Sequence, residues 1–201
     1  ASSIHAFGSE VGKALKKDRY LESIQAHFLS LPSYRRFPGD EEFRRDLHTR
    51  DLYNFRSRTY WLRRMENHDR KERVAVDEYT IEHILPQNPD LSPAWRQALG
   101  DDWQRVQQQW LHTLGNLTLT GYNAEYSDRP FAEKRDMKGG FKESPLQLNI
   151  SLRQAEAWNE AAIQDRAGQL ADIALQVWAA PSLDAATLAA YQPKKAPATG
   201  G

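Results

Sequence analysis

Two short strand-like segments, set among longer helical patterns, most constrain the fold of this chain. Residues 79–83 alternate in polarity and are rich in β-forming side chains, and residues 116–120 form a second such segment. The chain between them must form a loop at three prolines, Pro86, Pro89 and Pro93. A helix begins after the second segment at Arg129-Pro130, since proline is tolerated in a first helical turn. This order predicts a small ββα core within a mainly α chain, and therefore an α+β fold.

Helical patterns flank this core on both sides. The helix over residues 51–67 has a buried face formed by Leu52, Phe55, Thr59, Leu62 and Met65 or Glu66. Ser127 or Asp128 can cap the helix that begins at Arg129-Pro130, and Gly139-Gly140 ends it. Ser151 and Gln154 form a capping box that predicts one long helix to about residue 178. The other expected helices cover residues 12–31, 41–47 after an Asp40 cap, 93–99, and 101–114, which Gly115 ends.

The absence of cysteine narrows the kinds of site that the chain can build. Its 201 residues include no cysteine, which excludes disulfides and zinc sites with thiolate ligands. Any metal must therefore be held by oxygen or imidazole. No apolar run approaches the roughly 18–20 residues that span a bilayer, and no secretory signal opens the chain. We expect a cytoplasmic protein that does not enter a membrane.

The net charge is zero, with 27 basic and 27 acidic residues, but the charges are distributed unevenly. Residues 35–73 carry twelve Lys/Arg against eight Asp/Glu, whereas residues 74–121 carry two against six. A neutral protein has no global field that draws it to a polyanion, although a local basic helical face can still bind one. Arg56, Arg63 and Arg64 are the tentative DNA-phosphate contacts; the alternative is a solvated charged helix.

Four residues in the ββα segment carry groups that suit phosphodiester hydrolysis. This reaction needs a deprotonated water, stabilisation of the developing phosphorane charge and neutralisation of the leaving oxygen. His83 suits the first task as a general base. Glu82 and Asn123 offer a carboxylate and an amide oxygen, which can hold Mg²⁺ together with several waters. Asn116 can fix the loop beneath His83 through hydrogen bonds to the backbone.

These residues and their surroundings resemble a known group of nucleases. The segments Glu-His-Ile-Leu-Pro-Gln from Glu82 and Gly-Asn-Leu-Thr-Leu from Gly115, with the Asn that follows them, look like an HNH (His-Me finger) endonuclease. The closer resemblance is to the C-terminal nuclease domain of GmrSD-type restriction endonucleases and to SspE-like phage-defence nickases. The resemblance covers about residues 45–180, including the helix before the motif, the Phe131–Lys134 segment and the C-terminal helix.

The resemblance implies a role for each motif position. His83 activates water, Glu82 helps to bind the metal, Asn116 is the usually structural middle Asn, and Asn123 occupies the third, metal-binding position. The third position is Asn where many HNH enzymes have His, and the zinc-binding cysteine pairs of many HNH domains are absent. The implied cofactor is a divalent metal, Mg²⁺ or Mn²⁺. The implied activity is nicking of phage or modified DNA in a bacterial restriction or anti-phage defence protein.

The expected organisation is a single nuclease domain over residues 1–201. It would comprise a helical part (12–70), the ββα-metal core (77–138), a C-terminal helix (151–179) and a disordered tail (193–201). The chain begins with Ala and contains no phosphate-binding glycine loop, so we expect a C-terminal fragment of a protein whose preceding domain is an NTPase or sensor. The pattern leaves the oligomeric state open.

Several alternatives remain at this point. The chain can be a non-catalytic interaction domain that kept the HNH fold, or an RNase of the same fold. A zinc hydrolase would need clustered histidines, which the spacing of the other five does not provide. Glu82 and His83 are neighbours on a strand and point to opposite faces unless the strand ends there. Three residues each have two open roles. Lys134 either contacts the scissile phosphate or is a solvated helix residue, and Asn123 is either a metal ligand or a turn residue. His112 either approaches the site or has a core or capping role.

Overall fold

The computed structural model describes residues 40–54, 58–177 and 185–191. The chain divides into two compact units, one over residues 40–177 and one formed by residues 1–39 and 178–201. In the second unit, helix α11 (Ala185–Tyr191) is the described element. The predicted helix over residues 12–31 and the predicted disordered tail over 193–201 lie outside the described residues. The single domain expected over the whole chain stays a prediction.

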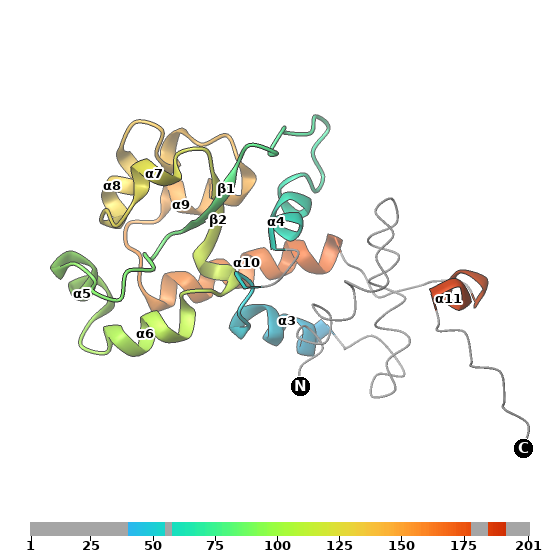
Figure 1. Ribbon diagram of the computed structural model, residues 1–201, viewed down its shortest axis with the longest axis horizontal. Helices are drawn as coiled ribbons and strands as arrows, with labels where there is room; N and C mark the ends of the chain where they lie inside the picture. The colour runs from blue at the N-terminus through green and yellow to red at the C-terminus, as the bar shows by residue number, and fades with distance from the viewer. Residues whose placement is uncertain (1–39, 55–57, 178–184, 192–201) are drawn as a thin grey trace, which may run out of the picture. The chain divides into compact units, whose positions relative to one another are not determined.

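The unit over residues 40–177 is mainly helical around one small sheet (Figure 1). This arrangement confirms the predicted α+β fold. Among the described helices, none combines the length and the apolar character that a bilayer crossing requires. In chain order the elements are α3 (Asp40–Thr49), α4 (Arg58–Glu66), β1 (Thr80–His83), α5 (Pro93–Leu99), α6 (Trp103–Trp110), η1 (Leu114–Asn116), β2 (Leu117–Thr120), α7 (Asn123–Tyr126), α8 (Phe131–Asp136), η2 (Phe141–Glu143), η3 (Gln147–Asn149), α9 (Ile150–Gln154) and α10 (Glu160–Val177).

The two predicted strands exist and pair with each other. β1 and β2 are antiparallel, with Glu82 opposite Thr118 and His83 opposite Leu117. The backbone pairing continues past β1, because the Ile84 amide donates to the Asn116 carbonyl at 3.0 Å. All four residues of β2 are buried, and β1 becomes buried at Glu82 and His83. The end of β1 is therefore held firmly where Glu82 and His83 occur.

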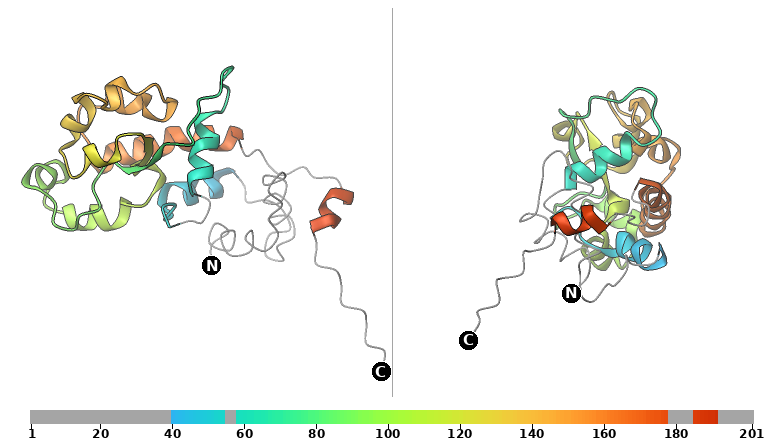
Figure 2. Two further views of the ribbon diagram at one scale, coloured as in Figure 1. Left: turned by 45° about the horizontal axis from the view of Figure 1, so that its top comes forward. Right: turned by 90° about the vertical axis from the view of Figure 1, so that its right-hand side faces the viewer.

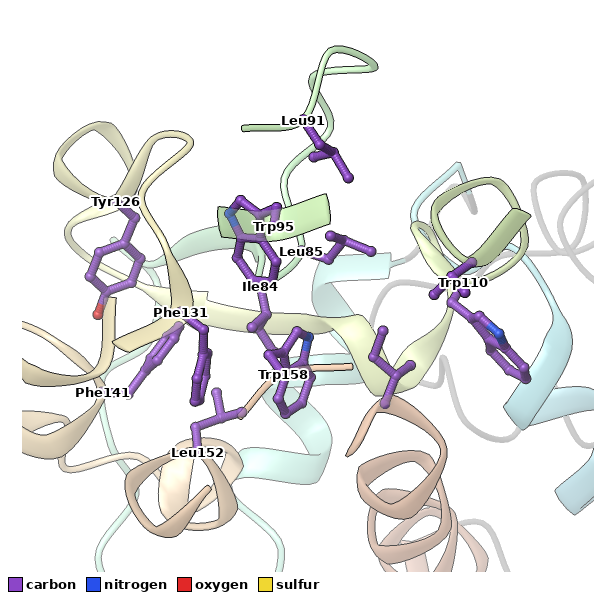
Figure 3. Close-up of a cluster of buried hydrophobic side chains, with 12 residues drawn as sticks. Ile84, Leu85, Leu91, Trp95, Trp110, Tyr126, Phe131, Phe141, Leu152 and Trp158 are labelled. Carbon is purple, nitrogen blue, oxygen red and sulfur yellow. The ribbon is translucent and has the colours of Figure 1, made fainter. Parts of the chain in front are cut away.

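An aromatic core supports the chain just after β1 (Figure 3). Ile84 and Leu85, fully buried, enter this core directly from the strand. The rings of Phe131 and Trp158 stack with centroids 5.3 Å apart, and Phe141 packs beside Phe131. Burying an aromatic ring of this size removes a large apolar area from water. The core thus attaches the backbone just after β1 to helices that lie more than forty residues later in the chain.

Helix α10 packs against η1, α3 and α4, and it runs beside α3 (Figure 2). Gly115 makes the contact with α10 possible: a Cβ there would lie 2.1 Å from the carbonyl oxygen of Ile163. The prediction that Gly115 ends a helix over residues 101–114 was wrong, since α6 ends at Trp110 and Gly115 lies within η1. Gly115 serves close packing and not a helix C-cap.

The single C-terminal helix predicted over residues 151–179 was also wrong. The structure has two helices, α9 and α10, separated by an extended backbone at Ala155. Trp158 lies in this break with its indole buried in the core. Asn159 then caps the start of α10, because its side-chain oxygen accepts the Ala162 amide at 2.9 Å. Burial of Trp158 and a new N-cap outweigh the uniform helical pattern.

Two further helix boundaries differ from the sequence pattern. The helix predicted over residues 51–67 begins at Arg58 in the described structure, because Asp51 accepts the Asn54 amide at 2.9 Å and holds a turn there; residues 55–57, with Phe55 and Arg56, lie outside the described residues. Neither Ser127 nor Asp128 caps α8, which follows Pro130. Asp128 instead accepts the Asn88 side-chain amide at 2.9 Å.

Candidate active site

His83 lies at the end of β1 against two other rings. Its centroid is 4.4 Å from that of Tyr53 and 5.1 Å from that of His112, both in edge-on geometry. Nε2 of His83 and Nδ1 of His112 are 3.0 Å apart, which is hydrogen-bond distance. His112 belongs to the segment between α6 and η1, so the site joins parts of the chain that are distant in sequence.

The surroundings of His83 favour its neutral form. Burial is the largest cause, followed by His112 and Lys134, and together these lower the pKa of His83 to about 3. Within the described residues, Nδ1 of His83 has no hydrogen-bond partner and is not among the buried atoms that lack one, so it retains access to solvent. The imidazole is thus unprotonated at neutral pH, with its Nδ1 free of protein partners among the described residues.

Glu82 points to the other face of β1 and contacts Lys134. The Lys134 ammonium donates to Oε1 of Glu82 at 2.6 Å and to the carbonyls of His83 and Ile84 at 3.0 and 3.1 Å. Both side chains are almost completely buried. An ammonium has three donors, and these three acceptors satisfy all of them. Lys134 is thus neither solvated nor at the surface; its charge serves Glu82 and the backbone of the motif.

Burial and charge oppose each other in this pair. Burial raises the pKa of Glu82 to about 7, although the Lys134 ammonium acts in the opposite direction and Asp128 adds to the rise. Burial also lowers the pKa of Lys134, while Glu82 opposes that change. Because the hydrogen bonds of Lys134 suit an ammonium, we assign the pair as an ion pair at neutral pH. Asp128 is a nearby carboxylate that the sequence pattern suggested only as a helix cap.

Asn116 is buried beneath the loop that follows β1. Its Oδ1 accepts the Leu85 amide at 2.8 Å and the Trp158 indole N–H at 3.1 Å. Its Nδ2 donates to the carbonyls of Leu85 at 3.1 Å and Leu111 at 2.9 Å. The side chain thus makes the four hydrogen bonds that an amide can form. This geometry suits a residue that fixes the motif and leaves no lone pair for a metal.

Asn123 occupies the first turn of α7 and is exposed. Its Nδ2 donates to the Ile81 carbonyl at 2.9 Å and to Oγ1 of Thr80 at 3.2 Å. These bonds hold α7 against β1, one residue from Glu82, while Oδ1 has no hydrogen-bond partner among the described residues. The structure therefore brings Asn123 to the strand of Glu82 and His83 with its amide oxygen available.

The oxygen donors around β1 match the preferences of a hard cation. Within the part of the chain that the structure describes, no three His, Asp or Glu side chains gather as a ready-made metal cage. Mg²⁺ does not need such a cage, because it keeps several waters and uses one or two protein oxygens. Oε1 of Glu82 is occupied by Lys134, and its second oxygen and Oδ1 of Asn123 remain as candidates. A hydrated divalent cation would have these two oxygens as its ligands from the protein.

The structure distinguishes among the arginines proposed for DNA binding. Arg63 donates to the Asp77 carbonyl at 2.9 Å and ties α4 to the chain before β1. Arg64 makes no hydrogen bond or ion pair within the described residues and is half-buried, whereas Arg56 lies outside the described residues. Arg58, which sequence reasoning missed, lies with its guanidinium 4.8 Å from the Tyr53 ring centroid, beside His83.

Tyr53 was also missed as a site residue. It stacks on His112 with ring centroids 5.1 Å apart and planes 13° apart, and it contacts His83 on its edge. No spacing rule links Tyr53 to His83 and His112, which follow it by thirty and fifty-nine positions, so only the tertiary structure reveals the cluster. The segment that contains Tyr53 gave a signal only through the resemblance of the helix before the motif to that family.

Comparison with known families gives one finding. The model of the family described as GmrSD restriction endonucleases, C-terminal domain, matches residues 37–173, which is more than half of the chain. No curated protein and no solved structure matches this chain. The matched range contains β1, β2, α7, α8 and every site residue described above.

Proposed function

This chain belongs to the family of GmrSD restriction endonuclease C-terminal domains, and we propose that it hydrolyses phosphodiester bonds of DNA by an HNH mechanism. One observation carries the mechanism: a buried, neutral His83 stands at the end of β1 with one ring nitrogen bonded to His112 and the other accessible. A neutral imidazole near a phosphodiester accepts a proton from an attacking water. Membership in a restriction endonuclease family makes DNA the expected substrate.

We assign His83 the role of general base. The cause of its neutrality is burial together with the nearby charge of Lys134, and the resulting pKa of about 3 keeps the imidazole unprotonated throughout the neutral range. A base with so low a pKa is weak in the ground state. A phosphodiester and the charge developing on it would raise the proton affinity of His83 when substrate binds, because negative charge favours the imidazolium.

We assign Glu82 and Asn123 to a divalent metal, Mg²⁺ or Mn²⁺. Glu82 offers a carboxylate oxygen near the end of β1, Asn123 offers an amide oxygen beside the start of that strand, and Lys134 holds the other oxygen of the carboxylate. When bound, a divalent ion stabilises the phosphorane charge and the leaving oxygen. The protein itself contributes the orientation: Asn116 fixes the loop, Lys134 fixes Glu82, and Asn123 joins α7 to β1.

One such site cleaves one strand, so the expected activity is nicking. Arg64 and Arg58 are the described basic side chains that we assign to DNA phosphates. We also propose that a sensor or NTPase domain of the same polypeptide directs the nuclease to phage or modified DNA. No described residue indicates which DNA modification such a domain would recognise.

The test is conversion of supercoiled plasmid to open-circle DNA with Mg²⁺ or Mn²⁺. We expect activity in the wild type, none in His83→Ala, and a large loss in Asn123→Ala with an unchanged fold. His68→Ala is the matched control, since His68 contacts Gln176 and not the site. Full activity in His83→Ala contradicts the mechanism.

The same assay separates the alternatives. A labelled RNA of the same length identifies an RNase of this fold if it is cut and DNA is not. A protein that binds DNA without cutting it under either metal supports the non-catalytic interaction domain. Chelation with EDTA should abolish nicking, and re-addition of Mn²⁺ should restore it.

A further inference from the structure

His112 lies where it can determine the tautomer of His83. The two rings share a hydrogen bond of 3.0 Å between Nε2 of His83 and Nδ1 of His112. A hydrogen bond between two neutral imidazoles holds one proton, which belongs to one nitrogen while the other accepts. The tautomer of each ring is therefore coupled to that of the other.

The backbone and a neighbouring ring hold His112 firmly. The amides of Leu52 and Tyr53 both donate to its carbonyl, at 2.9 and 3.3 Å. Its ring stacks on Tyr53 with the planes only 13° apart. Arg58 covers the Tyr53 ring with its guanidinium 4.8 Å from the centroid. His112 is thus ordered by three contacts that do not involve His83, so it acts as a fixed reference for the orientation of His83.

Only one of the two tautomer arrangements leaves a base at the accessible nitrogen. If Nε2 of His83 carries the proton and donates to His112, then Nδ1 of His83 is bare. If Nδ1 of His112 donates instead, then Nδ1 of His83 carries a proton and cannot accept one. The bond made by one ring nitrogen determines the state of the other, as in many histidine sites.

We propose that His112 is a positioning residue that accepts the Nε2 proton of His83 and so leaves Nδ1 of His83 free as the base. The proposal rests on the proposed nuclease function. When Nδ1 of His83 takes a proton from water, the proton on Nε2 stays in its hydrogen bond to His112. His112 gains no charge in that step.

Two substitutions test this role with different side-chain chemistry. His112→Phe keeps a flat ring beside Tyr53 and removes the acceptor. His112→Asn keeps an acceptor, because Oδ1 of Asn is as many bonds from Cα as Nδ1 of His. We expect kcat to fall about 10–100-fold in His112→Phe, as for other residues that orient an active histidine, with KM for DNA within about twofold. His112→Asn should recover most of kcat.

A measurement independent of cleavage separates this proposal from the nuclease function. ¹⁵N chemical shifts of the His83 ring in wild-type protein should show Nε2 protonated and Nδ1 bare, and in His112→Phe they should show a mixture of tautomers. A protonated Nδ1 in the wild type overturns the proposal, as does an unchanged kcat in His112→Phe. Equal losses in both variants, with a lowered melting temperature, would assign His112 to the fold alone. A wild type that cuts no nucleic acid but shows the expected tautomer contradicts the proposed function and not the hydrogen bond.

Discussion

The ammonium of Lys134 lies 2.6 Å from Oε1 of Glu82, and neither side chain has appreciable contact with solvent. Two charges inside a protein are tolerable only when each satisfies the other, because desolvation is costly. Lys134 also donates to the carbonyls of His83 and Ile84, so one side chain joins α8 to β1 and the residue after it at three points. The orientation of Glu82 therefore depends on a helix that begins about fifty residues later.

Removal of Lys134 should destabilise the fold strongly. Lys134→Met leaves the Glu82 carboxylate buried without a partner, and we expect a loss of about 3–5 kcal/mol in the free energy of unfolding. The double variant Glu82→Gln, Lys134→Met should lose less than Lys134→Met alone. Urea unfolding of the wild type, both single variants and the double variant measures this. Additive losses would mean that the two side chains do not interact.

Asn116 and Asn123 should respond differently to alanine. Asn116→Ala leaves the Leu85 amide and the Trp158 indole N–H without acceptors, which should cost about 3 kcal/mol of stability. Asn123→Ala should lower stability by less than about 1 kcal/mol, because its donors are exposed, yet abolish most nicking. Melting curves and plasmid nicking on the same samples measure both effects. A stable, inactive Asn116→Ala variant would instead favour a direct role for Asn116 in the reaction.

The buried His83 should make the protein sensitive to acid. Its pKa falls to about 3 on folding, so the unfolded chain binds a proton near pH 6.5 that the folded protein refuses. His83 therefore does not lower the free energy of unfolding above about pH 6.5. As the pH falls from 6.5 toward 3, His83 lowers it progressively, by about 2 kcal/mol between pH 7 and pH 5. Glu82, whose pKa is raised, acts in the opposite direction, so the wild type must be compared with His83→Gln at each pH. Urea midpoints of the two proteins should converge as the pH falls; parallel midpoints would contradict the shift.

Two glycines offer a matched test of the packing between η1 and α10. A Cβ on Gly115 would lie 2.1 Å from the Ile163 carbonyl oxygen, so Gly115→Ala must separate the two segments and should cost about 3 kcal/mol. Gly168 lies within α10, and its nearest contact for a Cβ is 3.8 Å away on His48. Gly168→Ala should therefore be neutral or gain up to about 1 kcal/mol from helix propensity. Thermal melting compares them, and equal melting temperatures would contradict the close approach at Gly115.

Local patterns predicted the elements better than their boundaries. Alternation and β-forming side chains located both strands to within one residue, and the helix expected over residues 93–99 matches α5, whose start the Ser92 hydroxyl caps by accepting the Trp95 amide. The C-terminal helix was wrong because a helical stripe does not reveal that Trp158 leaves the helix to enter the core. The predicted start of the helix at residue 51 was wrong, because the turn at Asp51 competes with helix formation over a few residues.

The sequence by itself determined the chemistry available at the site: a carboxylate beside a histidine at a strand end, two asparagines downstream, and no thiol to hold a metal. It also implied the family, which the match over residues 37–173 supports. Only the tertiary structure decided that His83 faces Tyr53 and His112 while Glu82 faces Lys134, because side-chain partners depend on segments that lie far apart in the chain. Burial, which no local pattern specifies, then sets the charge of each group, and charge decides which of them can act as a base.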